Sequence, residues 1–405
     1  MIPQFKPYFD LDEIKALLDK KHDVIPEFEE QFTKLVGNKF AISFPSGRLG
    51  LFCLLKALDI KNSTIITPSY TCIVVPSTIV VLKNTPRFVD ISLDDYNIDV
   101  NGVSAALTKE TRCIVPTHMY GNPANVKKLR DYVGEEIYIV EDAAQAILTK
   151  DVGRFGDAVF YSFNIEKQLF TFGGGMVTTN NEEIYEKLRK YRNDIFSKPS
   201  FFSELEKTFL LLNTPIIFSD FLFQWLYALW NIHGALGWKI KGWSLNSSTL
   251  PVEKIYSIKD NIAAYSRVQA AVGLSQLRKI NDSIQKRIKI AKYYGEKLKE
   301  ITGISLPPTD TGSSFSHYTF SINDRTAFEN FMRKKGIQIN KVFEYSTAHL
   351  PVFQKYTTKD QQLHNSFTAG SHNVNIPNYP QLLENRHKLD HIINSIRDYK
   401  TRKMH

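Results

Sequence analysis

The sequence predicts an α/β protein, in which helices sandwich a mostly parallel sheet and a smaller α/β domain follows. Short runs rich in valine, isoleucine and phenylalanine alternate with helical patterns through the first half of the chain. A long amphipathic stretch over residues 266–300 then leads into a second, shorter α/β pattern. We therefore expect a large domain over 1–264, and a connecting helix with a small C-terminal domain over 265–405.

The expected elements follow one another in a regular order. The strand-like runs are "KFAISF", "STIITP", "PRFVDI", "CIVPTHMYG", "IYIVEDAAQA" and "AVFYSF". The helical patterns between them are "SGRLGLFCLLKALDI", "CIVVPSTIVVLKN", "VNGVSAALTKE" and "NVKKLRDYVGEE". In the second half, "SHYTFSI", "RTAFENFMRKKGIQI" and a closing helix near 383–399 complete the smaller unit. Ligands of parallel sheets bind at the carboxyl ends of the strands, so polar residues at those ends matter most.

Composition narrows the function classes. The 405 residues are 43% hydrophobic and 23% charged, as in globular domains. The net charge is +9, and the cationic residues are scattered along the chain except for a basic C-terminal tail. Without a basic stripe interleaved with aromatic residues, no nucleic-acid partner is expected. The three cysteines, Cys53, Cys72 and Cys113, lack metal-site spacing, which favours reduced thiols, and no metal is expected. The N-terminus does not resemble a secretory signal, so we expect a cytoplasmic protein.

Residues 208–238 interrupt the pattern, within a longer apolar insert over about 200–250. They hold three tryptophans and a single formal charge, Asp220. Pro215 and Asp220 divide the stretch into pieces shorter than the roughly 20 apolar residues of a membrane-spanning helix. Two interpretations remain open. The stretch is either a buried helical hairpin or subunit interface, or an element that lies on the inner face of a membrane.

Asp142 is the first candidate for chemistry. It ends the apolar run "IYIVED", and Gln145 follows three residues later. A carboxylate at a buried strand end is costly unless a cation meets it, and a protonated pyridine nitrogen would be such a cation. The alternative is that Asp142 caps the N-terminus of a following helix.

Lys167 is the second candidate. It follows the strand-like run that ends at Ser162 and precedes Gly173–Gly175. A lysine at the mouth of a sheet can bond covalently to a carbonyl cofactor, although most lysines beside glycine turns are merely solvated. The order is not that of a Walker A loop, whose glycines come before the lysine.

Ser46-Gly47 lies between a strand and a helix, where free amides and the helix dipole hold phosphate. Taken alone, the dipeptide is more often a plain strand–helix turn. Together, however, the three pieces form the set that pyridoxal 5′-phosphate (PLP) requires: a phosphate turn, a carboxylate for the ring nitrogen and a bonding lysine.

With these motifs in place, the chain resembles the DegT/StrS-type sugar aminotransferases, which have the PLP-dependent transferase fold type I. The resemblance is dense over about 38–192 and looser over about 265–400. The matching segments are "SGR" (46–48), "PSYTC" (68–72), "PRFVDISLDDYNID" (86–99), "PTHMYGNPANV" (116–126), "VEDAAQA" (140–146) and "FGDAVFYSFNIEKQLFTFGGGMVTTN" (155–180).

The resemblance implies a role for each matching position. Lys167 would bond the cofactor and move the proton, Asp142 would pair with the ring nitrogen, and Gln145 would contact the cofactor near its 3-hydroxyl. Ser162 and the Ser46-Gly47 turn would hold the phosphate. His349, in "STAHLPVF", falls where the family places a histidine near the substrate.

Three positions depart from the family pattern. Arg48 replaces the usual threonine and would add a charged contact to phosphate or to a substrate carboxylate. Cys72 stands where an aromatic residue usually stacks on the cofactor ring, so either the thiol packs there or Tyr70 takes that place. Asn261 is the candidate for an asparagine that reaches the neighbouring subunit's phosphate.

The predicted function is therefore a PLP-dependent aminotransferase that moves an amino group from glutamate or glutamine to a nucleotide-linked keto sugar, for cell-surface glycans or secondary metabolites. The family resemblance also implies a homodimer with shared sites. Two alternatives are a sugar dehydratase on the same scaffold and a non-catalytic, membrane-associated regulator. Lys167 argues against the dehydratase, because such relatives carry histidine there.

Overall fold

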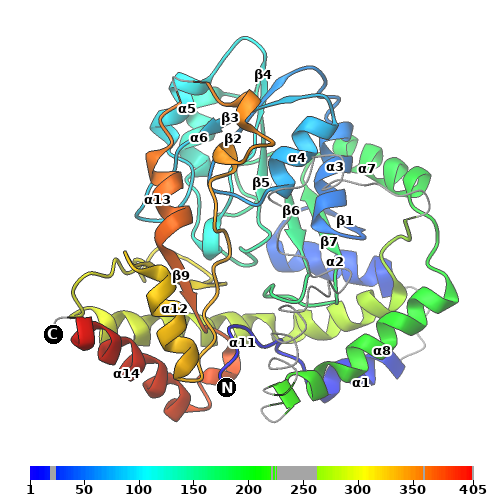
Figure 1. Ribbon diagram of the computed structural model, residues 1–405. Helices are drawn as coiled ribbons and strands as arrows, with labels where there is room; N and C mark the ends of the chain where they lie inside the picture. The colour runs from blue at the N-terminus through cyan, green and yellow to red at the C-terminus, as the bar shows by residue number, and fades with distance from the viewer. Residues whose placement is uncertain (19–23, 220–221, 224, 226–261, 359–360, 404–405) are drawn as a thin grey trace.

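The computed structural model describes residues 1–18, 24–219, 222–223, 225, 262–358 and 361–403 (Figure 1). Within these ranges a seven-stranded sheet has the order β1-β7-β6-β5-β4-β2-β3. The strands are β1 (Phe40–Phe44), β2 (Thr64–Pro68), β3 (Thr85–Val89), β4 (Thr111–Ile114), β5 (Tyr138–Asp142), β6 (Ala158–Ser162) and β7 (Gly175–Thr179). Only β7 runs antiparallel to its neighbours. The predicted mostly parallel sheet is thus confirmed.

Both faces of the sheet are buried, which explains why its strands read as continuous apolar runs. Ile65 and Val140 belong to the core shared with α3 (Gly47–Ala57), α4 (Val74–Val81) and α7 (Glu182–Ile195). The next residue in β2, Ile66, and the preceding one in β5, Ile139, face a separate core with α5 (Val100–Ala106) and α6 (Val126–Val133). Successive side chains therefore alternate between the two helical layers.

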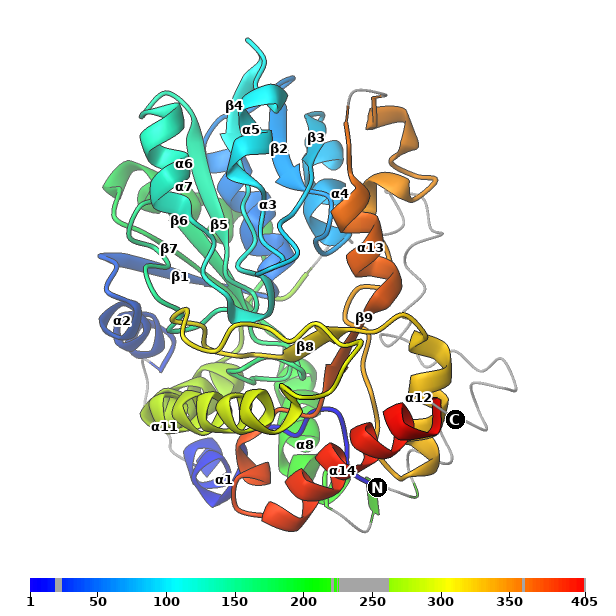
Figure 2. The ribbon, with the colours of Figure 1, turned by 90° about the vertical axis from the view of Figure 1, so that its left-hand side faces the viewer.

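The predicted long helix is confirmed as α11 (Arg267–Leu298), which runs below the sheet (Figure 2). Ser266 caps its first turn in a capping box with Gln269. The first half of α11 packs with α2 (Val24–Val36) on an aromatic core that includes Phe28 and Phe163. The second half supplies Ile290 and Tyr294 to a different core. One helix therefore joins the two parts of the molecule.

The second core belongs to the smaller unit. Its elements are the antiparallel strands β8 (Tyr318–Ser321) and β9 (Asn373–Ile376), with α12 (Arg325–Lys334), α13 (His364–His372) and α14 (Arg386–Lys403). Ile2 also lies in this core: its amide donates to the Gly336 carbonyl (2.7 Å), and the Gln338 amide donates to the Ile2 carbonyl (2.9 Å). The small α/β unit predicted from the C-terminal pattern is present, and the N-terminus packs against it.

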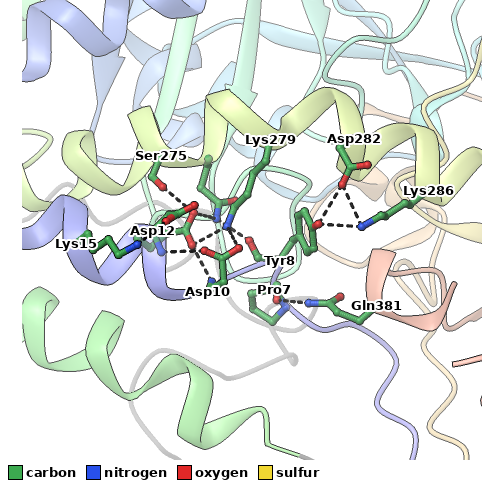
Figure 3. A network of polar contacts seen from close by, with 12 residues as sticks. Pro7, Tyr8, Asp10, Asp12, Lys15, Ser275, Lys279, Asp282, Lys286 and Gln381 are labelled. Atoms are coloured by element: carbon green, nitrogen blue, oxygen red, sulfur yellow. Dashed lines mark hydrogen bonds and ion pairs between the residues drawn. The ribbon is translucent and has the colours of Figure 1, made fainter. Parts of the chain in front are cut away.

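Residues 7–13, here called the N-terminal clasp, bind along α11 (Figure 3). Glu13, in α1 (Leu11–Leu18), is fully buried and accepts hydrogen bonds from Ser275 Oγ (3.1 Å), Gln276 Nε2 (3.0 Å) and Lys279 Nζ (2.7 Å). Further along, Lys286 Nζ donates to the Tyr8 hydroxyl, which itself donates to Asp282 Oδ2 (3.0 Å each). Gln381 Nε2 donates to the Pro7 carbonyl (2.9 Å). The clasp thus connects α1, α11 and the C-terminal core.

Most of the described part of the apolar insert is α8 (Phe201–Ile217), in which Pro215 is accommodated within the helix. One face is buried through Leu211, which packs with Phe170 and Val272. The other face exposes Phe201, Phe202, Leu205, Phe209, Leu212 and Ile216. We call these six residues the α8 stripe. None of the helices in the described ranges combines the length and apolarity needed to cross a membrane. Of the predicted segment 208–238, residues 220–221, 224 and 226–238 lie outside the described residues.

Candidate active site

The candidate site lies where β5 and β6 end. Asp142 closes β5 and Ser162 closes β6, and the two strands pair in parallel with Asp142 opposite Phe160. Alternation along β5 separates two adjacent carboxylates. Asp142 therefore lies on the same face of the sheet as Val140, the face that packs against α3. Glu141 lies on the opposite face with Ile139.

Glu141 is satisfied inside the protein. Its carboxylate accepts from the amides of Gly153 and Gly156 (3.0 Å each) and lies 2.8 Å from His118 Nε2. These contacts hold the turn that precedes β6 against the sheet. Glu141 is therefore a structural carboxylate.

Asp142 is buried with far fewer partners. Its Oδ1 accepts from the Ala144 amide (3.0 Å) and its Oδ2 lies 3.5 Å from Thr117 Oγ1, and among the described residues no cation forms an ion pair with it. Burial raises the pKa of Asp142, and the Ala144 amide and the charge of Lys167 oppose this rise. The alternative role as a helix cap is not found, because residues 143–149 form turns. Asp142 thus lacks the cation that a buried carboxylate requires.

Lys167 sits in a tightly bonded loop between β6 and β7. Its amide donates to the Asn164 carbonyl (3.0 Å), and Gln168 next to it accepts from the Ile147 amide (3.0 Å) and donates to the Ser314 carbonyl (3.1 Å). The Lys167 side chain is only 12% exposed. The interpretation of Lys167 as an ordinary solvated lysine is therefore not supported.

Ser46 and Gly47 begin α3 beside the glycine return. The Leu49 amide donates to Ser46 Oγ (3.2 Å), which makes Ser46 the N-cap of the 11-residue helix. A Cβ atom at Gly47 would lie 2.8 Å from the Tyr161 carbonyl oxygen and 3.2 Å from Ser162 Cβ. Only glycine fits there, and Gly174, with a φ of +103°, bridges back to Ser46. A helix N-terminus, Ser46 and Ser162 therefore meet in one place, as an anion site requires.

Gln145 and Cys72 complete the surroundings of Asp142. Gln145 Oε1 accepts from the Tyr120 amide (2.9 Å), which fixes the orientation of its side chain. Burial raises the pKa of the Cys72 thiol, and the charges of Lys167, Asp142 and Arg48 also act on it. Cys72 is thus close to the predicted site residues.

Tyr70 is unavailable as a stacking residue. Its side chain has no exposed surface, its hydroxyl lies 2.6 Å from that of Tyr120, and Phe343 packs edge-on against its ring. Of the two candidates from the sequence, Cys72 is the one that faces the site.

The structure does not bring His349 to these residues. It is exposed, with Nδ1 2.9 Å from Ser346 Oγ and its ring 5.3 Å from that of Phe367, and no described contact joins it to Lys167 or Asp142. Arg48 is an exposed residue of the first turn of α3. Asn261 lies outside the described residues.

The sequence did not predict the contribution of the smaller unit. Burial lowers the pKa of His317 to about 3, and the charge of Lys167 lowers it further. Burial also raises the pKa of Tyr345, on which the Cys72 thiol and Glu166 act as well. Both residues lie more than a hundred positions from Lys167 and stand in no recognisable motif, so only the fold reveals them.

Comparison with known proteins identifies the family. The model of the DegT/DnrJ/EryC1/StrS aminotransferase family matches residues 15–209 and 263–397. The chain belongs to this family. It is therefore an aminotransferase of the PLP-dependent class, and the predicted family, fold and enzyme class are confirmed.

Relatives match over nearly their whole length. An uncharacterized protein of Methanocaldococcus jannaschii is 29% identical over 95% of this chain and 94% of its own. The dTDP-4-amino-4,6-dideoxy-D-glucose transaminase of Shigella dysenteriae is 25% identical over 98% and 96%. Among solved structures, the Helicobacter pylori aminotransferase involved in the biosynthesis of pseudoaminic acid has a TM-score of 0.76 and 21% identity, covering 98% of each chain.

The residues present fit PLP. A buried carboxylate without a cation suits a protonated ring nitrogen, and a sterically closed glycine at a helix N-terminus suits a phosphate. A shielded lysine lies at the same sheet edge.

Proposed function

We propose that the protein transfers an amino group from glutamate or glutamine to a keto sugar carried on a nucleotide, in glycan or secondary-metabolite biosynthesis. The observation that carries the proposal is that a shielded Lys167 lies in the same site as a buried Asp142, for which the described residues provide no ion-pair partner. Family membership supports the reaction type. The Shigella relative, whose name specifies a dTDP-linked amino sugar, supports the substrate class.

When bound, PLP would supply an electron sink for the carbon that loses its proton. In our proposal Lys167 is the catalytic residue: its amine would bond the cofactor and, when free, would move the proton. Asp142 would hold a proton on the ring nitrogen, and Gln145 would orient the ring. Ser46, Gly47 and Ser162 would bind the phosphate, with Arg48 nearby, and Cys72 would lie next to the ring.

The test is reconstitution followed by a spectrum and an assay. Purified protein incubated with PLP should turn yellow, and glutamate or glutamine should bleach the visible band. A dTDP-linked 4-keto-6-deoxy sugar should restore the band and yield an amino sugar detectable by mass spectrometry. A protein that stays colourless at saturating PLP would refute the proposal. Bleaching by the amino acid, with no amination of any nucleotide-linked keto sugar, would refute the substrate class alone.

We further propose two domains, 1–264 and 265–405, and a homodimer with sites shared across the interface. The separate cores of the sheet and of the smaller unit support the division. The homodimer rests on the family resemblance.

For the α8 stripe we propose contact with an anionic membrane surface. A row of six exposed apolar side chains on one helix and the net charge of +9 support this occupant. Wild-type protein should sediment with vesicles that contain phosphatidylglycerol. The double variant Phe202→Ser/Phe209→Ser should bind at least about tenfold more weakly, because each phenylalanine loses roughly 1.5 kcal/mol or more of burial.

The matched control replaces Leu93 and Tyr132, which are exposed elsewhere, by serine and should bind as the wild type does. Wild-type protein that stays in the supernatant would contradict membrane contact. Light scattering on the same samples should show dimers throughout. If the stripe variant alone becomes monomeric, the stripe is a subunit interface instead.

A further inference from the structure

Glu166, directly before Lys167, carries a charge that the proposed reaction does not yet use. Its Oε1 lies 3.3 Å from Lys167 Nζ. Within the described ranges, neither side chain forms any other ion pair, and Asp142 lies beyond ion-pair distance of the amine. The lysine amine is therefore paired with its sequence neighbour and not with the buried aspartate.

The Glu166 carboxylate stays ionised. The charge of Lys167 is the largest influence on the pKa of Glu166 and lowers it, and burial opposes this. The carboxylate is therefore available as a partner for the Lys167 amine at neutral pH.

Other groups near Glu166 do not compete for it. Glu166 lines a small cavity together with Gln4, Arg287, His317, Asn340 and Asn378. Arg287 directs its Nη1 to the carbonyls of Ser316 (3.2 Å) and Asn378 and forms no ion pair with Glu166. The low pKa of His317 keeps that ring neutral. Three other titratable groups interact electrostatically with this ion pair: Cys72 and Asp142 with Lys167, and Tyr345 with Glu166.

We propose that Glu166 is a positioning residue that holds the Lys167 ε-ammonium group beside the reaction centre whenever the amine is not bonded to the cofactor. This inference rests on the proposed function. A free lysine side chain has several rotatable bonds, and an ion pair confines it to the geometry that proton transfer needs. Asp142 is the other carboxylate that senses the charge of Lys167, and pairing there would take the anion from the ring nitrogen. Glu166 keeps these two charges apart.

The test measures the amine directly, in protein stripped of cofactor. Acetylation of Lys167 by limiting acetic anhydride is followed by peptide mass spectrometry between pH 7 and 10. In Glu166→Gln the Lys167 amine loses its ion-pair partner and is free to react, so labelling of Lys167 at pH 8 should rise about threefold. Glu166→Asp, which keeps the charge, should stay close to the wild type.

Lys187 provides the matched control. It forms an exposed 2.9 Å ion pair with Glu183 on α7, and its labelling in the same digest should not change in either Glu166 variant. Conversely, Glu183→Gln should leave Lys167 labelling unchanged. Identical Lys167 labelling profiles in the wild type and Glu166→Gln would overturn the proposal. Because no cofactor is present, this result is independent of whether the protein binds PLP.

In the reconstituted enzyme, Glu166→Gln should lower kcat by about tenfold and leave the KM for the keto sugar unchanged. Glu166→Asp should recover part of the loss. A change in KM alone would assign Glu166 to substrate binding and overturn the positioning role.

Discussion

Lys167→Ala protein incubated with PLP should lack the yellow band of the wild type, and its turnover should fall at least about 10²- to 10⁴-fold. The reason is that one amine both bonds the cofactor and moves the proton, and proton transfer by a positioned side chain alone contributes a factor of this size. The measurements are the visible spectrum after desalting and the initial rate of amino-sugar formation.

Two further variants separate chemistry from charge. Lys167→Arg keeps a cation near Glu166, but a guanidinium stays protonated and does not bond a carbonyl carbon, so it should be as inactive as alanine. Lys187→Ala removes a surface lysine and should change neither the spectrum nor the rate. A yellow band that survives desalting in Lys167→Ala would show that another amine holds the cofactor.

Asp142→Asn should lower turnover by about 10²- to 10³-fold, the scale measured when one preorganised electrostatic group is removed from an active site. The amide is nearly the same shape as the carboxylate but does not keep a proton on the ring nitrogen. The rate and the PLP affinity, from titration of the visible band, measure the effect. Turnover equal to the wild type would exclude this role for Asp142.

The same substitution should make the cofactor-free protein more stable at neutral pH. Since burial raises the folded-state pKa of Asp142, this group favours folding only when protonated, and its contribution is lost as pH rises through the folded pKa. Asparagine does not ionise and avoids that loss. In urea unfolding at pH 7, the free energy of unfolding of Asp142→Asn should therefore exceed that of the wild type. This difference in stability should shrink at acidic pH. Asp151→Asn, at an exposed position, should show neither effect.

The sheet and much of the candidate site follow from local patterns. Asp142, Ser162 and the Ser46-Gly47 turn each adjoin a strand, and because parallel strands end at one edge, their positions in the chain were enough to predict that they meet. Lys167 was predicted from the loop after β6. Local order also indicated α11, whose apolar stripe persists over many turns.

Other features depend on packing between distant segments. The sequence left Tyr70 and Cys72 as equal candidates for the cofactor ring, and only the burial of Tyr70 against Tyr120 and Phe343 separates them. From the smaller unit, His317 comes close to Lys167 and Tyr345 to Cys72 and Glu166, and no periodicity of the sequence indicates either contact. His349 was placed by family position in a divergent loop, and the fold leaves it exposed. The sequence shows that Glu166 adjoins Lys167, but only the structure shows that their side chains form an ion pair.

Ile2 and the N-terminal clasp have a consequence for the order in which the protein folds during synthesis. Ile2 pairs with Gly336 and Gln338, so its partners are translated more than three hundred residues later, which at about 5–20 residues per second is a wait of roughly 20 to 70 s. Glu13 waits for Ser275 and Lys279 in the same way. The sheet between β1 and β7 needs neither contact. We therefore expect the nascent sheet to form first, whereas Ile2 and the clasp reach their final positions only after α11 and the smaller unit have been synthesised.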